Sequence, residues 1–258
     1  MAWHRRTTHN MISIIKPTLN EKSVIAHTLG WLRAAIDGKR LAAAHQIEVI
    51  ISDGKSTDGT PEIARADGAD IVVEYRGTAR QTIAAGRNAG AAAAHGEFLA
   101  FMDADCTILD PAAFFDKVLW HFRNDPELVA LNVAIRVLPE YETWMDWAVF
   151  NLFNDYVWLV NNVLHIGMSA GEFQMMRREA FDKAHGYNES LVASEDLDLF
   201  QRLSKIGKVR YEKGLTIYHT GRRGHKIGWP RLLSQWIGNS LSVMRGKKAV
   251  SKEWTVIR

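Results

Sequence analysis

Short apolar runs alternate with longer amphipathic stretches through the first half of the chain. The runs are rich in Ile and Val and end in polar or glycine-containing clusters, so each predicts a strand, whereas apolar positions between them recur at helical spacing. The expected strands are 11–16, 46–51, 71–75 and 97–102, and the main expected helices are 21–36 and 79–94. This alternation predicts an α/β fold with a mostly parallel sheet and helices on both faces.

The second half has a less regular pattern. It predicts helices at 110–124, 195–206 and 229–244 and strands at 128–137, 172–177 and 209–212. A further helix is expected after Asp58-Gly59, with Thr60 as its N-cap and Pro61 as its first residue. Neither a repeat nor a low-complexity linker divides the sequence, so we expect a single domain over 1–258, with a regular first half at about 11–106 and a less regular second half at about 107–258.

Composition and charge narrow the class of protein. A chain of 258 residues with 47% hydrophobic residues can bury a large core without disulfides, and its one cysteine, Cys106, is expected to be a buried apolar residue. No apolar run is long enough to span a bilayer, which predicts a cytoplasmic protein. The net charge is only +3, yet residues 222–258 hold nine Lys and Arg against one acid. This basic C-terminal part suggests contact with phosphates, anionic lipid or nucleic acid, or else a solvated tail.

Two carboxylates follow the strand at 97–102. Asp103 and Asp105 are separated by Ala104, and a turn there allows both carboxylates to approach one cation. Hard oxygen ligands with open positions suit Mg²⁺ or Mn²⁺ shared with a diphosphate. Such a pair alone is weak evidence, because capping or surface acids look the same. Its value comes from four other segments in a fixed order.

Those segments are SIIKPTLNE at 13–21, IISDGKSTDGT at 50–60, GRNAG at 86–90 with AHGE at 94–97, and SEDLDL at 194–199. Together with Asp103-Ala104-Asp105 they resemble the family 2 glycosyltransferases, from about Ser13 to about His219. The resemblance implies the GT-A fold, a nucleoside-diphosphate sugar as donor (UDP- or GDP-linked) and a divalent cation at Asp103 and Asp105.

The resemblance also implies that the first half of the chain, about 11–106, binds the nucleotide sugar, and it implies roles for single residues there. Pro17, Thr18 and Glu21 match the segment at the nucleoside, and Asp53 matches the acidic residue at the base. The next residues read Gly54-Lys55-Ser56 where the family commonly has Asp-Gly-Ser, which leaves the identity of the base open. Arg87 matches an arginine near the donor, where a cation beside a diphosphate is physically sensible; a helix-surface ion pair is the alternative.

The resemblance implies that the second half of the chain, about 107–258, binds the acceptor and supplies the catalytic base. Glu195 and Asp196 match the family's acidic pair, so Asp196 is expected to take the acceptor's proton and Glu195 to orient it or bind acceptor. Favourable placement of acids at a helix N-terminus is the other interpretation. His219 matches a late histidine that serves as a metal ligand in several relatives. Gly171 lies in a glycine-containing stretch that suits close approach of a ligand.

Two basic or aromatic segments stay open in their roles. Arg222, Arg223 and Lys226 are expected either to form a lid over the donor diphosphate or to belong to the basic surface. The aromatic-rich segment 144–164 predicts an amphipathic helix, which either packs on the core or rests on an anionic membrane surface with the basic C-terminal part. The second interpretation suits a lipid-linked acceptor and a peripheral position at the inner face of a membrane.

The function expected from these observations is inverting transfer of a sugar to a hydroxyl acceptor. Three alternatives remain: a retaining GT-A enzyme that acts on a small acid such as glycerate, a nucleotidyltransferase, and a non-catalytic nucleotide- or sugar-binding module. Pro17-Thr18-Leu19-Asn20-Glu21 stands where a nucleotidyltransferase would carry a Gly-rich basic loop, which argues against that class. No nucleic-acid-binding motif is recognisable, so no nucleic acid is expected as partner. The sequence does not indicate an oligomeric state.

Overall fold

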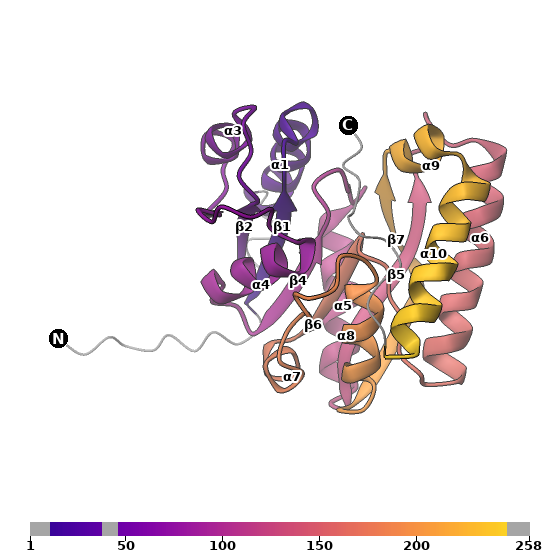
Figure 1. Cartoon of the computed structure of the whole chain (residues 1–258). Coiled ribbons are helices and arrows are strands. Elements are labelled where there is room, and N and C mark those ends of the chain that lie inside the picture. The colour runs from indigo at the N-terminus through magenta and orange to yellow at the C-terminus, as the bar shows by residue number, and fades with distance from the viewer. Residues whose placement is uncertain (1–10, 38–45, 247–258) are drawn as a thin grey trace.

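The computed structural model describes residues 11–37 and 46–246 (Figure 1). The basic C-terminal part is therefore described only as far as Gly246, and residues 247–258 lie outside the described residues. The strands are β1 (Ile12–Thr18), β2 (Ile47–Asp53), β3 (Ile71–Glu74), β4 (Phe98–Met102), β5 (Leu128–Val137), β6 (Phe173–Arg177) and β7 (Lys208–His219). The helices are α1 (Lys22–Asp37), α3 (Thr60–Ala66), α4 (Ile83–Ala93), α5 (Pro111–Asn124), α6 (Trp144–Trp158), η1 (Leu159–Val163), α7 (Arg178–Lys183), α8 (Glu195–Leu203), α9 (Arg222–Ile227) and α10 (Trp229–Met244).

The described strands form one mixed sheet in the order β3-β2-β1-β4-β6-β5-β7. β1 pairs parallel with β2 and β4, β2 with β3, and β5 with β7. β6 runs antiparallel between β4 and β5, so it joins the two halves of the chain. The predicted α/β fold with a mostly parallel sheet is therefore confirmed, with one reversed strand that the apolar pattern did not reveal.

Helices cover both faces of this sheet. Neighbouring residues of a strand point toward opposite faces, so they pack against different helices. Ile14 belongs to a buried cluster that includes side chains of α1 and α5, and Ile15 belongs to a second cluster with side chains of α4, α7 and α8. Both isoleucines are fully buried. The continuous apolar run of β1 thus follows from burial on two faces.

The second half of the sheet is covered differently on its two faces. In β7, Glu212 contacts His121 and Lys117 of α5, whereas Lys213 contacts Asp155 of α6. α5 and α6 therefore lie on opposite faces of this strand. α10 runs beside α6 at the right of Figure 1, and their rings meet at Phe153 and Trp236. Among the helices of the described chain, none combines the length and apolar character that a bilayer crossing requires.

Several predicted boundaries are corrected. Gly59, with a φ of 89°, is the N-cap of α3 in place of Thr60, which is the first helical residue. The Asp58 carboxylate accepts hydrogen bonds from the amide and hydroxyl of Thr60, so the carboxylate provides the capping contact. The helix expected at 79–94 starts only at Ile83, after its N-cap Thr82. The strand expected at 209–212 continues to His219, and the helix expected to end at residue 206 ends at Leu203.

Candidate active site

The donor-side loops meet at the carboxyl ends of β1 and β2. Thr18 and Asp53 are register partners at the ends of these strands, and the Thr18 hydroxyl donates to Asp53 Oδ1 over 2.9 Å. Asp53 Oδ2 accepts from the amides of Lys55 and Ser56, at 3.0 and 2.7 Å. Asp53 is almost completely buried. Its carboxylate therefore fixes the shape of the 54–56 turn beside Thr18, at the edge of the sheet where ligands bind in such folds.

A buried lysine fixes the turn that carries the paired aspartates. Lys16 is fully buried in β1, and its Nζ donates to the carbonyl of Asp103 over 2.9 Å. Burial lowers the pKa of Lys16 to about 8, against the opposing negative charges of Asp105 and Asp103. Cys106 itself is buried, as expected, and its thiol pKa is raised by burial. The lysine thus fixes the backbone from which Asp103 and Asp105 project.

Arg87 links the two acidic segments of the site. Its Nη1 lies 2.8 Å from Glu195 Oε1, and its Nη2 lies 3.0 Å from Asp103 Oδ1. The side chain is 2% exposed; burial by itself would lower its pKa, but the negative charges of Asp103 and Glu195 raise it. The alternative of a surface ion pair is therefore wrong. The end of β4 and the start of α8 are connected through one buried guanidinium.

Two more residues complete the surroundings of Arg87. The carbonyl of Gly171 accepts from Nη2 over 3.2 Å, and a Cβ at this position would lie 2.5 Å from that nitrogen. A side chain at position 171 would therefore force the guanidinium of Arg87 to move. On another side, the ring of Tyr187 lies 5.3 Å from the guanidinium carbon. A cation over an aromatic face is favourable, which further fixes Arg87 in place.

Asp105 contacts groups from the last part of the site. Its Oδ2 accepts from the Thr220 hydroxyl over 2.9 Å and lies 3.1 Å from Arg222 Nε. The terminal nitrogens of Arg222 contact both oxygens of the Glu21 carboxylate. Arg222 therefore connects the end of β1, the turn after β4 and the start of α9. Among the three residues expected in a lid, Arg222 has these contacts with Glu21 and Asp105.

His219 ends β7 and is half-buried. Its Nδ1 accepts from the Gly221 amide over 3.3 Å, and the ring of Phe150 packs against it with centroids 5.0 Å apart. The buried Nε2 has no hydrogen-bond partner. Burial lowers the pKa of His219, and the charges of Asp105 and Asp103 oppose this shift. In the neutral ring the contact from the Gly221 amide leaves the proton on Nε2, so a divalent cation would bind Nε2 only in the other tautomer, with the proton on Nδ1 and the contact with Gly221 lost.

In the described structure these side chains do not form a complete set of metal ligands. Within residues 11–37 and 46–246, no cluster of three or more His, Cys, Asp or Glu side chains is arranged to hold a metal ion. Asp103 is bound by Arg87, and Asp105 by Thr220 and Arg222. Asp103, Asp105 and His219 as ligands of Mn²⁺ or Mg²⁺ therefore remain a prediction, which the chemistry of the donor set supports.

Two carboxyl groups near Arg87 hold protons unusually well. Burial, followed by the charge of Glu195, raises the pKa of Asp196 to about 7. Its Oδ1 accepts from the Leu197 amide, and Glu195 and Asp196 lie in the first turn of α8, as the sequence indicated. Burial and the charge of Asp103 also raise the pKa of Glu172 to about 8. A carboxyl group with a pKa near neutrality is suited to proton transfer at physiological pH.

The structure brings most predicted site residues together at one edge of the sheet. Direct contacts link Thr18 to Asp53, Glu21 to Arg222, Arg222 to Asp105, and Asp103 through Arg87 to Glu195. Pro17 is half-buried at the end of β1, and Ala104 is buried between the aspartates. No nucleoside contact is established for Pro17, Thr18, Glu21 or Asp53, so these roles remain predictions.

Sequence reasoning missed three residues. Lys16 was visible as a charge inside an otherwise apolar strand, and it could have been marked for that reason. Glu172 was noticed only as the end of a glycine-containing stretch, and Tyr187 gave no signal because its partner Arg87 lies 100 residues earlier in the chain. The approach of such residues depends on tertiary packing, which local spacing does not encode.

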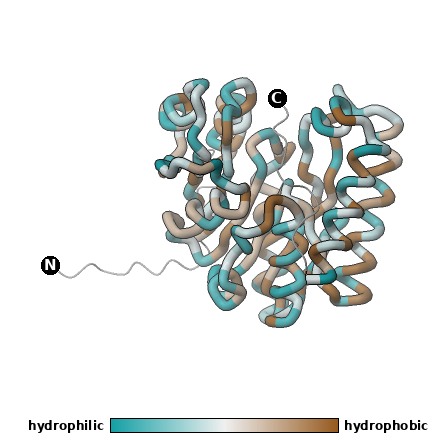
Figure 2. The backbone as a smooth tube through the Cα atoms, viewed as in Figure 1, coloured by the Kyte–Doolittle hydropathy of each residue, from teal (hydrophilic) through white to brown (hydrophobic). Residues whose placement is uncertain are grey.

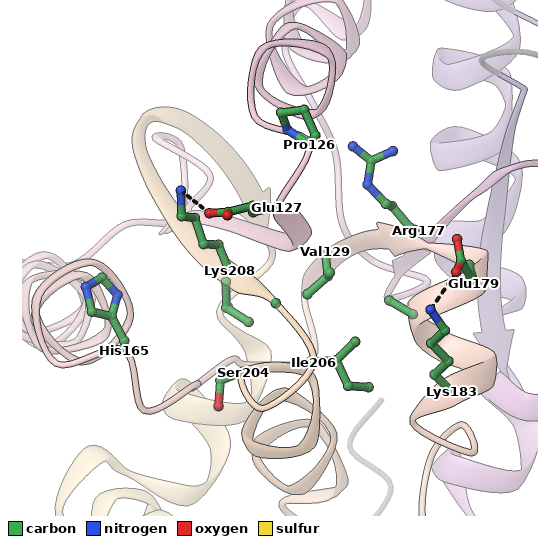
Figure 3. A pocket seen from close by; sticks show the side chains of 13 residues that line it. Pro126, Glu127, Val129, His165, Arg177, Glu179, Lys183, Ser204, Ile206 and Lys208 are labelled. Atoms are coloured by element: carbon green, nitrogen blue, oxygen red, sulfur yellow. Dashed lines mark hydrogen bonds and ion pairs between the residues drawn. The ribbon is translucent and has the colours of Figure 1, made fainter.

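A separate hollow lies at the opposite ends of the strands (Figure 3). It is lined by residues at the starts of β5 and β7, including Glu127 and Lys208, and by Lys183 of α7. Lys208 pairs with Glu127, and Lys183 pairs with Glu179 (Figure 3). None of the sequence-predicted site residues lines it, so the hollow and the candidate active site are distinct.

Several curated proteins resemble this chain in sequence. Curated relatives include a Beta-monoglucosyldiacylglycerol synthase of Nostoc sp., 27% identical over 95% of this chain and 54% of that protein. A low-salt glycan biosynthesis hexosyltransferase of Haloferax volcanii is 36% identical over 37% of this chain and 21% of that protein. The chain thus spans about half the length, or less, of these relatives.

Solved structures share the fold. A mannosyltransferase of Pyrobaculum calidifontis, in complex with GDP-Man and Mn²⁺, matches 92% of this chain and 65% of its own, with a TM-score of 0.66 and 20% identity. A glucosyl-3-phosphoglycerate synthase of Mycobacterium tuberculosis, solved with Mn²⁺, UDP and its product, matches 96% of this chain and 88% of its own (TM-score 0.59, 21% identity). The family model described as Glycosyl transferase family 2 matches residues 13–184, and the chain belongs to this family.

Proposed function

We propose that this protein is an inverting glycosyltransferase that moves a hexose from a UDP- or GDP-linked donor to a hydroxyl acceptor. The observation that carries the proposal is the bridge of Arg87 between Asp103 and Glu195. It joins the carboxylate at the end of β4, expected on the donor side, to the acidic pair of α8, expected on the acceptor side. Donor and acceptor groups would then meet across one short, rigid connection.

In this proposal Asp196 is the general base. Its carboxylate takes the proton of the acceptor hydroxyl while that oxygen forms a bond to the anomeric carbon. The bond from the anomeric carbon to the donor's phosphate oxygen breaks, and the nucleoside diphosphate leaves with the electron pair. The raised pKa of Asp196, about 7, makes it a stronger base than an exposed aspartate once it is deprotonated. Arg87 holds Glu195 beside it and thereby fixes the start of α8.

Asp103, Asp105 and His219 would hold the divalent cation. When bound, Mn²⁺ or Mg²⁺ neutralises charge that develops on the leaving diphosphate. Arg222 lies against Asp105, so its guanidinium is placed to contact the same phosphates. Thr18 and Asp53 shape the loop at which we place the nucleoside. Structural neighbours that were solved with Mn²⁺ and GDP-Man or UDP support this assignment by their shared fold.

For the acceptor we favour a lipid-linked hydroxyl. A curated relative that covers 95% of this chain is named Beta-monoglucosyldiacylglycerol synthase, a name that states a glycolipid product. The proposal places the enzyme in the cytoplasm, at the inner face of a membrane. Acceptor class depends on contacts outside the shared donor site, so fold similarity alone carries little weight for it.

Calorimetric titration with UDP, GDP and dTDP, each with Mn²⁺ or Mg²⁺, tests the donor site. We expect one nucleotide to bind in a metal-dependent manner and Asp105→Ala to lose that binding. Asp155→Ala removes an exposed aspartate of α6 and should leave it unchanged. If well-folded wild-type protein binds none of the nucleotides, the proposed activity is wrong and a binding module of other specificity becomes the better hypothesis.

The stereochemistry has its own test. With the donor identified, NMR of the anomeric proton in the first product distinguishes inversion from retention. A product with the opposite anomeric configuration to the donor supports Asp196 as base in a single displacement. Retention would instead favour the alternative of a transferase that acts on a small acid.

A further inference from the structure

The outer surface of α6 and α10 is unusually apolar for an exposed helix pair. Trp144 is 75% exposed, Leu152 74% and Trp147 54%. Other exposed apolar residues of α6 and η1 are Tyr156, Trp158, Leu159 and Val163, and those of α10 are Ile237, Leu241 and Met244. Figure 2 shows brown segments repeated along both helices at the right of the molecule. We call these exposed residues of α6, η1 and α10 the apolar face.

The helical pattern of α6 explains why this face is not part of the core. The inward side of the helix packs through Phe150 and Val157, which are buried. The outward side is mostly apolar and polar Asp146 and Asn154 point inward, so the amphipathic pattern expected from the sequence, with a polar outer side, is wrong. An apolar outer side is typical of a helix covered by other apolar material. Of its two charged residues, Asp146 is buried against His225 and Trp229, and Asp155 pairs with Lys213. The exposed side therefore presents little net charge of its own.

Positive charge borders the apolar face. Apart from Arg222, which is paired with carboxylates of the site, α9 and α10 contain Arg223, Lys226 and Arg231 and no Asp or Glu. Exposed Arg245 follows α10, and the sequence continues with Lys247 and Lys248. Aromatic and aliphatic side chains beside a basic border are the combination that favours an interface with anionic lipid. A second copy of the chain would place like charges against each other, which argues against self-association here.

Buried aromatic residues connect the helices of the apolar face to the candidate active site. Phe150 of α6 packs on His219, and Trp229, the first residue of α10, packs on Phe150. The exposed Trp144 and Trp147 lie in the first turn of the same helix, next to Asp146 and its partner His225 of α9. A surface that covers the apolar face would thus lie close to the part of the site that contains His219.

We propose that the apolar face docks on the surface of a bilayer that contains anionic lipid, with the tryptophans of α6 at the headgroup level. This membrane-docking face presents the candidate site to acceptors that reside in the membrane. It adds a surface to the proposed function and names the residues that form it. Docking itself requires neither donor nor cation.

Flotation of the full chain with vesicles tests the proposal. The vesicles are phosphatidylcholine alone or phosphatidylcholine mixed with phosphatidylglycerol, and no nucleotide is added. Wild-type protein should float with the mixed vesicles, less with neutral ones, and less at high salt, because salt screens the attraction between basic residues and lipid. The double variant Trp147→Ser with Leu152→Ser should bind the mixed vesicles at least about tenfold more weakly, given the apolar area that it removes.

Trp120→Ser is the matched control. Trp120 is 57% exposed, like Trp147, but it lies on α5, on the opposite face of β7. Its loss should leave flotation unchanged. Far-UV circular dichroism, the urea denaturation midpoint and nucleotide binding should be similar in all three proteins, which separates lost docking from lost folding or a wrong donor site.

Two results would overturn the proposal. One is wild-type protein that stays unbound with anionic vesicles, or a double variant that floats as well as wild type. The other is a wild-type dimer in gel filtration that becomes a monomer in the double variant without any flotation of either protein. The second result would assign the apolar face to a second copy of the chain.

Discussion

Both terminal nitrogens of Arg222 contact the Glu21 carboxylate, at 2.9 and 3.0 Å, although the residues lie 201 positions apart. The same guanidinium reaches Asp105 through Nε. α9, which begins with Arg222, lies between Gly221 and Gly228, and both glycines have a positive φ, at 70° and 84°. Arg222 therefore stands at the start of a short helix with a glycine at each end, between two carboxylates of the site.

Arg222→Ala should weaken nucleotide binding. Without the guanidinium, the carboxylates of Glu21 and Asp105 would face an incoming diphosphate with less positive charge nearby. We expect about tenfold weaker binding of the cognate nucleotide with Mn²⁺, as for a lost charge-assisted hydrogen bond. Calorimetry measures this effect, with Arg231→Ala, an exposed arginine of α10, as control. Unchanged affinity in Arg222→Ala would place this arginine outside the donor site.

His219→Ala should weaken the metal-dependent part of nucleotide binding by about tenfold or more, since it removes an imidazole whose Nε2 is unpartnered. His225→Gln is a useful contrast, because His225 Nε2 already contacts Asp146 over 2.8 Å. That variant should lose stability in urea denaturation while the dependence on Mn²⁺ persists. Equal loss of Mn²⁺ dependence in both variants would argue against His219 as a ligand.

Asp196→Asn should lower kcat by about 10²- to 10⁴-fold while nucleotide affinity stays the same, because a general base acts in the chemical step. Asp198→Asn, in the same turn of α8, removes a surface pair with Arg202 and should have a small effect. Since the pKa of Asp196 is raised to about 7, its protonated form predominates below that pH and cannot accept a proton. The wild-type rate should therefore rise with pH up to about 7 and then level off. A rate that stays the same between about pH 5 and about pH 8 would contradict this role.

Arg87→Lys should destabilise the fold by about 3 kcal/mol or more. A single ammonium cannot span Asp103 and Glu195 as the guanidinium does, so a buried carboxylate would lose its partner. Arg65→Lys is the matched control, because Arg65 pairs with Glu74 at the surface and should contribute less than about 1 kcal/mol. Urea denaturation of both variants gives the two values. Similar small losses would mean that Arg87 is not structurally required.

Much of the fold was predictable because the apolar runs of β1, β2 and β4 are long, and each ends in a polar cluster. The reversed strand β6 was not, since strand direction depends on the partners Phe101 and Leu131 on either side rather than on its own residues. The end of β7 was missed because Lys213 and Gly214 interrupt its apolar pattern at a register shift. Backbone hydrogen bonds across the shift continue the strand despite that polar interruption.

The candidate site was predicted better by motif order than by geometry. Asp103, Asp105 and Glu195 were each marked, yet nothing local indicated that Arg87 would join them or that Arg222 would contact both Glu21 and Asp105. Ion pairs across 100 or 200 residues follow from packing of whole elements. The pKa of Glu172 likewise depends on burial and on Asp103, which its own neighbours in sequence do not reveal.

The position of β6 limits how this protein can be recombined with its relatives. β4 ends the half that we expect to bind the donor, but its free edge is covered by β6, which is encoded about 70 residues later. A fragment cut after residue 106 would expose a row of unpaired backbone groups on a strand whose side chains are all apolar, and we expect it to aggregate. A chimera that exchanges acceptor specificity therefore has to carry its own β6, or graft only loops and helices around a retained one.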